Sequence, residues 1–175
     1  MNLSIKTADE NNSTVILAND PDADRLAVAE KLPTGEWKIF NGNELGALFG
    51  WWMWFNYKEK NKELFEKDKS QCKNAYMLYS TVSSNILNSI AEKEGFSCED
   101  TLTGFKWMGN RAHDLMQQNK TIIFSFEEAI GFMCGTNVLD KDGISAEAVA
   151  AEMAIYLKEK ENRTLNQKLD WIYET

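Results

Sequence analysis

Short apolar runs alternate with helical repeats along most of the chain, which predicts a layered fold of strands and helices. Strands are expected where apolar residues form short runs bounded by polar turns. The expected strands cover residues 14–18, 26–30, 36–40, 75–79, 96–102 and 121–126. Helices are expected where apolar residues recur every three or four positions. They cover residues 44–57, 82–94, 107–119 and 145–160. This order favours an α/β fold with a mixed, largely parallel sheet and flanking helices.

Several element boundaries carry their own signals. Gly95 is expected to end the helix 82–94, and Ser145 to cap the helix 145–160. Thr164 and Gln167 match a capping box, which predicts a last helix. The charged segment 58–73 is expected to be a surface loop. The side chains expected to point inward from two of these helices are Val82, Ile86, Leu87, Ile90, Ala112, Leu115 and Met116.

Composition narrows the classes of function. The 175 residues suffice for one domain, or one domain and a fragment of another. Acidic residues outnumber basic ones by 27 to 19, which argues against non-specific binding to nucleic acid or to an anionic membrane. The longest apolar run, 46–55, is about half as long as a membrane span. Cys72, Cys98 and Cys134 stand far apart and indicate reduced thiols of a cytoplasmic protein.

The acidic loop 20–25, with the sequence Asp-Pro-Asp-Ala-Asp-Arg, is the strongest candidate site. Asp20, Asp22 and Asp24 follow a buried strand, and three clustered carboxylates repel one another unless a cation compensates them. Oxygen ligands suit Mg²⁺, and the neighbouring Arg25 can bind a phosphate through paired hydrogen bonds. A solvated turn with an internal counter-charge is the alternative. A calcium loop of the EF-hand type is disfavoured, because its sixth position is arginine rather than glycine.

A second candidate is the segment 101–110, with the sequence TLTGFKWMGN. Gly104 permits a tight turn after the expected strand, and Lys106 can present a positive charge to a phosphate. The alternative is a plain connection between a strand and a helix, with Phe105 and Trp107 as core side chains.

Two more motifs carry charged groups. Glu127 and Glu128 follow an apolar strand and can accept hydrogen bonds from sugar hydroxyls, or they mark an acidic strand end at the surface. Lys141 lies between Asp140 and Asp142, just before an expected helix. It belongs either to a solvated turn or to a lysine that binds phosphate or transfers a proton.

Taken in order, four segments resemble the α-D-phosphohexomutases, and within them the phosphoglucomutase-2 or phosphopentomutase branch with its sister, glucose 1,6-bisphosphate synthase. The segments are ANDPDADRLAVAE, TLTGFKWMGN, FEEAIG and LDKDG. The resemblance implies that residues 1–40 are the C-terminal part of domain 2 with its metal loop, and residues 41–175 the sugar-binding domain 3. The phosphoserine loop of domain 1 and the phosphate loop of domain 4 have no counterpart here. We therefore expect a fragment whose site those two domains complete.

The resemblance also implies roles for single residues. The implied Mg²⁺ ligands are Asp20, Asp22 and Asp24, the implied catalytic residues are Arg25 and Lys141, and the expected substrate-binding residues are Thr103, Gly104, Lys106, Glu127 and Glu128. Ala129 stands where many members have serine, which is compatible with pentose phosphates.

The implied reaction is that of a phosphosugar mutase. Such an enzyme interconverts the 1- and 6-phosphates of glucose, or the 1- and 5-phosphates of ribose and deoxyribose, with glucose 1,6-bisphosphate as the activating intermediate. The isolated chain is expected to be inactive. The alternatives are glucose 1,6-bisphosphate synthase, or a truncated chain that binds metal or a partner without turnover.

Overall fold

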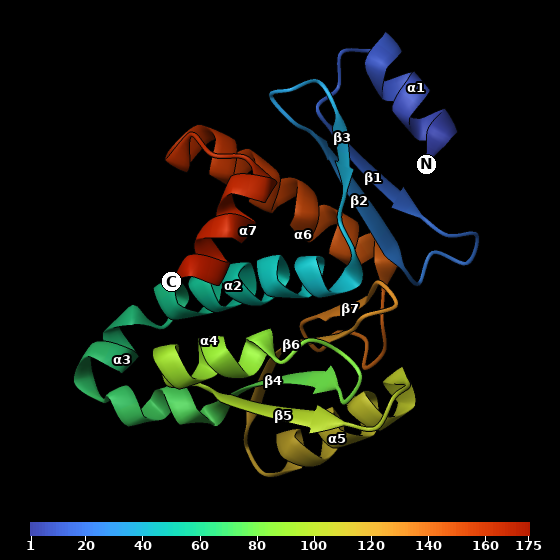
Figure 1. Ribbon diagram of the computed structural model, residues 1–175. Coiled ribbons are helices and arrows are strands. Elements are labelled where there is room, and N and C mark those ends of the chain that lie inside the picture. The colour runs from blue at the N-terminus through green and yellow to red at the C-terminus, as the bar shows by residue number, and fades with distance from the viewer.

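The computed structural model describes residues 1–175 and contains two β-sheets joined through helices (Figure 1). The helices are α1 (Asn2–Glu10), α2 (Gly42–Lys60), α3 (Lys62–Lys67), α4 (Ile86–Glu94), α5 (Phe105–Gln117), α6 (Gly143–Tyr156) and α7 (Leu165–Glu174). The strands are β1 (Val15–Asn19), β2 (Leu26–Lys31), β3 (Trp37–Ile39), β4 (Ala75–Ser80), β5 (Ser97–Thr101), β6 (Thr121–Glu127) and β7 (Gly131–Cys134). A 3₁₀-helix, η1 (Lys69–Asn74), and a π-helix, η2 (Leu157–Glu161), complete the chain.

The larger sheet has the strand order β5-β4-β6-β7 and lies between helices. β4 pairs in parallel with β5 and β6, and β7 runs antiparallel to β6. Met77 and Phe124 point from this sheet into the main core, where α2, α4, α6 and α7 also pack. Leu78 and Ile122 point to the other face, against α5. The predicted α/β class with a mixed, largely parallel sheet is confirmed.

The smaller sheet, β1-β2-β3, is antiparallel and is flanked by α1 and α6 (Figure 1). Leu26 and Val28 of β2 are fully buried and share the main core with Ala146 and Ala150 of α6. The turn between β1 and β2 is thereby placed beside the large sheet. The division into domains at residue 40 stays a prediction.

The sequence predicted a surface loop over residues 58–73, and this prediction was wrong. α2 continues to Lys60, and α3 and η1 follow it. Phe65 and Cys72 are buried, and the Phe65 ring lies 6.0 Å from that of Trp54. Two widely spaced apolar anchors among many charges are enough to fold this segment onto the core, but they give no helical periodicity.

Three helix predictions were wrong in detail. The helix predicted from 82 begins at Ile86, and Val82 is exposed, because the Ser83 N–H turns back to the Ser80 carbonyl. Helix α6 begins at Gly143, since the Asp142 side chain accepts from the Ile144 N–H and caps the helix instead of Ser145.

On α5, Met116 is partly exposed and Trp107 is mostly exposed, because only the stripe that includes Ala112 and Leu115 faces the sheet.

Other signals were correct. Thr164 and Gln167 form the predicted capping box of α7, and Gly95 ends α4 with a left-handed φ of 92°. Strand β7 was missed, because a tight turn at 128–130 follows β6 at once. No helix combines the length and the apolar character that a membrane crossing requires.

Candidate functional site

The acidic loop 20–25 connects the antiparallel strands β1 and β2, and its carboxylates converge. One oxygen from each of Asp20, Asp22 and Asp24 lies within 4.8 Å of the others. Ala23 adopts a left-handed φ of 58°, which turns the chain sharply between the acids. The Arg25 N–H donates to Oδ1 of Asp20 over 3.1 Å. Desolvation opposes ionisation of Asp20, but hydrogen bonds from the N–H groups of Arg25 and of Asp20 itself, with the positive charge of Arg25, hold its pKa below the usual value.

The backbone of the loop is fixed by the start of α6. The Gly143 N–H donates to the Ala23 carbonyl over 3.0 Å, and the Asn19 side-chain amide donates to the Arg25 carbonyl over 2.8 Å. A Cβ atom at position 143 would overlap the Arg25 carbonyl oxygen and lie 2.7 Å from that of Ala23. Only glycine permits this close approach.

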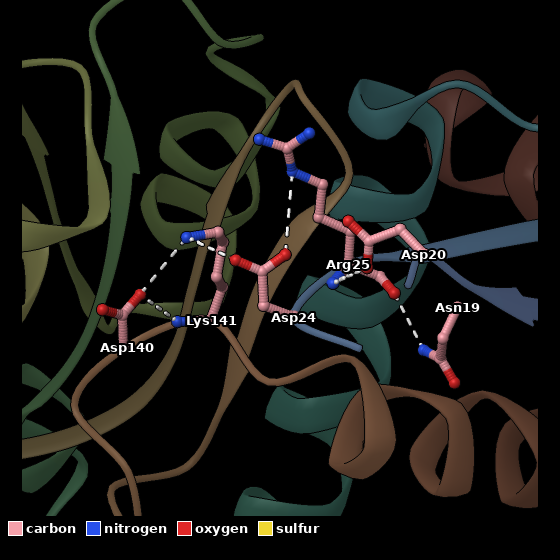
Figure 2. A network of polar contacts seen from close by, with 6 residues as sticks. All are labelled: Asn19, Asp20, Asp24, Arg25, Asp140 and Lys141. Atoms are coloured by element: carbon pink, nitrogen blue, oxygen red, sulfur yellow. Dashed lines mark hydrogen bonds and ion pairs between the residues drawn. The ribbon is translucent and has the colours of Figure 1, made fainter. Parts of the chain in front are cut away.

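Lys141 brings a positive charge to the acidic loop. Its Nζ lies 3.0 Å from Oδ2 of Asp24 and 3.6 Å from Oδ1 of Asp140 (Figure 2). The side chain is 19% exposed and lies over the Phe105 ring, 5.7 Å from its centroid. Burial disfavours the ammonium form, but the hydrogen bond to Asp24 and the charges of Asp140, Asp24 and Glu127 raise the pKa of Lys141.

Arg25 lies on the other side of Asp24. Its Nε is 3.9 Å from Oδ1 of Asp24, and the end of the guanidinium group points away from this carboxylate (Figure 2). The side chain is about half exposed, so its other N–H groups are free to bind a ligand. Asp24 therefore lies between two cations, one more buried and one open to solvent.

The turn between β6 and β7, residues 127–131, packs against the acidic loop. The Leu26 N–H donates to the Ile130 carbonyl over 3.1 Å, and Arg25 pairs with Gly131 as an isolated bridge. Ile130 has a left-handed φ of 56°. For a β-branched residue this conformation costs on the order of 1–3 kcal/mol, and it persists only where the surroundings require it.

Glu127 is only 7% exposed and lies near Lys141, since its Oε1 and the Lys141 Cδ each lie 2.9 Å from the position that a Cβ atom of Gly131 would take. Burial raises the pKa of its carboxyl group, the charges of Glu128 and Asp140 add to this effect, and those of Lys141 and Arg25 oppose it. The carboxylate of Glu128, in contrast, accepts hydrogen bonds from side chains at the end of β4. The two adjacent glutamates thus have different surroundings.

The segment after β5 lies further out. Gly104 has a φ of 108° and precedes the first residue of α5, so Lys106 belongs to the first turn of a helix rather than to a loop. Thr103 and Lys106 are exposed, and neither forms a hydrogen bond or ion pair with the acidic loop. The Phe105 ring links this segment to Lys141. The structure thus brings together the acidic loop, Arg25, Lys141 and the 127–131 turn.

Two residues of the site region were missed in the sequence. Ser80 and Ser83 lie at the carboxyl end of β4, where ligands bind in parallel sheets, and both contact Glu128. The available signal is the run from Ser80 to Asn85 directly after an apolar strand, which is polar at every position except Val82, where the predicted helix begins.

Comparison with known proteins shows the family of the chain. Residues 41–174 match the family described as phosphoglucomutase/phosphomannomutase, alpha/beta/alpha domain III. The chain belongs to this family. The resemblance inferred from the four sequence motifs is confirmed.

Curated relatives support the same family, and a solved structure shows the same fold. The chain is 58% identical over 173 residues to phosphopentomutase of Homo sapiens and covers 27% of it. It is 56% identical over 174 residues to glucose 1,6-bisphosphate synthase of Homo sapiens, again 27% of that protein. In both cases 99% of this chain is covered, so the chain spans about a quarter of these relatives. The N-acetylphosphoglucosamine mutase of Aspergillus fumigatus, solved with GlcNAc-6P and magnesium, is 12% identical with a TM-score of 0.58, over 88% of this chain and 34% of that one.

Proposed function

We propose that this chain forms the metal-binding and sugar-binding part of a Mg²⁺-dependent phosphosugar mutase of the phosphopentomutase type. The observation that carries this proposal is the convergence of Asp20, Asp22 and Asp24 beside Arg25 and Lys141. Three carboxylates with all-oxygen donor atoms fit a hard divalent cation. The identity of 58% to a phosphopentomutase supports the reaction class.

The proposal includes a division of labour along the longer enzyme. Residues 1–40 would be the end of its domain 2, and residues 41–175 its domain 3. Domains 1 and 4 would supply the phosphoserine and a second phosphate-binding loop, with glucose 1,6-bisphosphate as the activating intermediate. The substrates would be the 1- and 5-phosphates of ribose or deoxyribose and the 1- and 6-phosphates of glucose.

Phosphoryl transfer depends mainly on positioning and on electrostatic stabilisation. Mg²⁺ held by the three aspartates would neutralise charge on the phosphoryl group. The guanidinium group of Arg25 would bind phosphoryl oxygens through its exposed N–H groups. Glu127 would accept a hydrogen bond from a sugar hydroxyl, and Lys141 would donate a proton to, or accept one from, the sugar oxygen that exchanges the phosphoryl group.

The outer segment after β5 would complete the substrate site. Thr103, Gly104 and Lys106 would approach the distal phosphate of the sugar, where an exposed lysine adds positive charge. A cytoplasmic location fits the three free cysteines, Cys72, Cys98 and Cys134.

A second candidate function is glucose 1,6-bisphosphate synthase, favoured by the identity of 56% to that enzyme. The two functions differ in the phosphoryl donor, which for the synthase is 1,3-bisphosphoglycerate. Dependence of activity on that donor in the longer enzyme would favour the synthase. A chain that binds Mg²⁺ and sugar phosphates without turnover is the third candidate.

Phosphorus NMR of ribose 5-phosphate titrated with this chain, with and without Mg²⁺, tests the proposal. We expect the phosphate signal to shift only when Mg²⁺ is present. The absence of any Mg²⁺-dependent shift would contradict the proposed site. A second sample with ribose 1-phosphate, Mg²⁺ and glucose 1,6-bisphosphate should show no conversion. Conversion would mean that a residue of this chain accepts the phosphoryl group.

A further inference from the structure

Glu127 and Glu128 are neighbours in the sequence, but their carboxylates serve different surfaces. Glu127 is the last residue of β6, and Glu128 is the first residue of the turn that follows it. Glu127 faces Lys141, and its Oε1 lies 2.9 Å from the position that a Cβ atom of Gly131 would take. Glu128 faces the carboxyl end of β4. The carboxylate of Glu128 therefore does not point toward Lys141 and the proposed sugar-phosphate site, as that of Glu127 does.

The carboxylate of Glu128 is held by two hydroxyl groups. Its Oε2 accepts from Oγ of Ser80 and from Oγ of Ser83, each over 3.1 Å. The Glu128 N–H in turn donates to Oγ of Ser83 over 3.0 Å, and the two serine oxygens lie 2.7 Å apart. Ser80 is fully buried. These hydrogen bonds join the 127–131 turn to the turn that follows β4.

The strained turn needs such an attachment. Ile130 keeps its left-handed conformation only if neighbouring contacts determine the path of the chain. One contact is the close packing of Gly42 against the Glu128 carbonyl group. Another is the hydrogen bond from the Leu26 N–H to the Ile130 carbonyl, which leads directly to the acidic loop. The serines and Glu128 fix the opposite end of the same turn.

We propose that Glu128 is a positioning residue for the sugar-phosphate site, acting through Ser80 and Ser83 and not through contact with the ligand. The hydrogen-bonded set holds the 127–131 turn so that Glu127 faces Lys141 and the turn stays joined to the acidic loop. This inference rests on the proposed function and adds a specific role to three residues.

The test compares four variants with the unchanged chain in the presence of Mg²⁺. The variants are Glu128→Ala, Glu128→Gln, the double variant Ser80→Ala with Ser83→Ala, and all three alanine changes together. Ribose 5-phosphate is the probe, titrated by phosphorus NMR. Glu92→Ala, an exposed glutamate of α4 without a hydrogen-bond partner, is the matched control.

We expect Glu128→Ala and the double serine variant each to weaken ribose 5-phosphate binding about tenfold. The combined variant should lose no more ribose 5-phosphate affinity than either of these two variants, because all three remove the same hydrogen bonds. Glu128→Gln should remain within about threefold of the unchanged chain, since its carbonyl oxygen still accepts from both hydroxyls. Equal losses for Glu128→Gln and Glu128→Ala, with normal binding by the serine variant, would overturn the inference in favour of direct contact.

Amide hydrogen exchange gives a second readout that does not depend on sugar binding. The Leu26 N–H should exchange about tenfold faster in Glu128→Ala, while the amides of β4 keep their protection and report an intact fold. If the unchanged chain binds no ribose 5-phosphate, the proposed function fails. Faster Leu26 exchange would then still support positioning, and unchanged exchange would overturn it.

Discussion

The acidic loop 20–25 and the turn 127–131 are built alike and yet use their carboxylates in opposite ways. Each joins two antiparallel strands, and each contains a non-glycine residue in the left-handed region, Ala23 at φ 58° and Ile130 at φ 56°. In the loop, three carboxylates at alternate positions converge within 4.8 Å. In the turn, two adjacent carboxylates diverge. A carboxylate cluster is thus defined by the path of the backbone and not by closeness in the sequence.

The two turns also meet. The Leu26 N–H bonds to the Ile130 carbonyl, and Lys141 lies 3.0 Å from Asp24 while its charge also acts on Glu127. A displacement of either turn therefore changes the other. Variants that move one turn at a time test how strongly the proposed metal binding and sugar binding depend on this contact.

The largest effect is expected when one of the proposed Mg²⁺ ligands of the acidic loop is removed. Asp22→Asn should weaken Mg²⁺ binding by at least about 100-fold. Losing a group that only hydrogen-bonds to a metal ligand commonly lowers metal affinity about 10–100-fold, and losing a ligand itself should cost more. Titration calorimetry measures this affinity. Asp100→Asn, an exposed acid on β5 without a hydrogen-bond partner, is the control. Normal Mg²⁺ affinity in Asp22→Asn would exclude the loop as the metal site.

The next effect concerns the attachment of the acidic loop. Gly143→Ala places a methyl group against the Arg25 and Ala23 carbonyl groups, so it should destabilise the fold by about 1–3 kcal/mol. Mg²⁺ binding should weaken as well, since the loop must move. Thermal unfolding with and without Mg²⁺ measures both effects. A variant with unchanged stability and unchanged Mg²⁺ affinity would show that the loop does not depend on α6.

Gly42→Ala makes the corresponding change at the other turn. Its methyl group would overlap the Glu128 carbonyl group, so we expect a similar loss of about 1–3 kcal/mol. Ribose 5-phosphate affinity should fall more than Mg²⁺ affinity, the reverse of the order for Gly143→Ala. If both variants lower both affinities in the same ratio, the two turns behave as one unit.

The smallest effect is a pH-dependent change in stability at Glu127. Burial raises the pKa of this carboxyl above its usual 4.5, with Glu128 and Asp140 adding to the shift and Lys141 and Arg25 opposing it. The folded state therefore binds the proton more tightly than the unfolded state, and the stabilisation present below pH 4.5 is lost as pH rises through the folded pKa. Glu127→Gln should raise stability at pH 7, by less than about 1 kcal/mol.

Denaturant unfolding of Glu127→Gln between pH 4 and pH 8 tests this sign. Glu94→Gln is the matched opposite case. Hydrogen bonds from Lys58 and Trp54 outweigh burial and lower the pKa of Glu94. The contribution of Glu94 to the stability of the fold is therefore present above pH 4.5 and is lost as pH falls. Glu94→Gln should therefore lower stability at pH 7. A loss of stability in Glu127→Gln would contradict the buried, unpaired state of that carboxylate.

Elements with dense apolar patterns were predictable, and elements held by a few anchors were not. Strand β6 and the capping box of α7 follow from local chemistry, because the interactions that form them lie within one turn or one strand. The segment 58–73 folds through Phe65, which packs on Trp54 and Tyr57 of α2, and through Cys72, which lies against Gly95. Two such anchors leave no periodic pattern inside the segment. Strand β7 needed the turn at Ile130, whose conformation its residue type disfavours.

The sequence by itself determined the α/β class, the family and the acidic loop, because strand periodicity and three alternating carboxylates are local properties. Only the tertiary structure decided which charged groups meet. It brought Lys141 to Asp24 across more than a hundred positions, and it directed Glu127 and Glu128 to different surfaces. The physical reason is that such contacts depend on the packing of β2 and α6 against the large sheet, which no local pattern encodes.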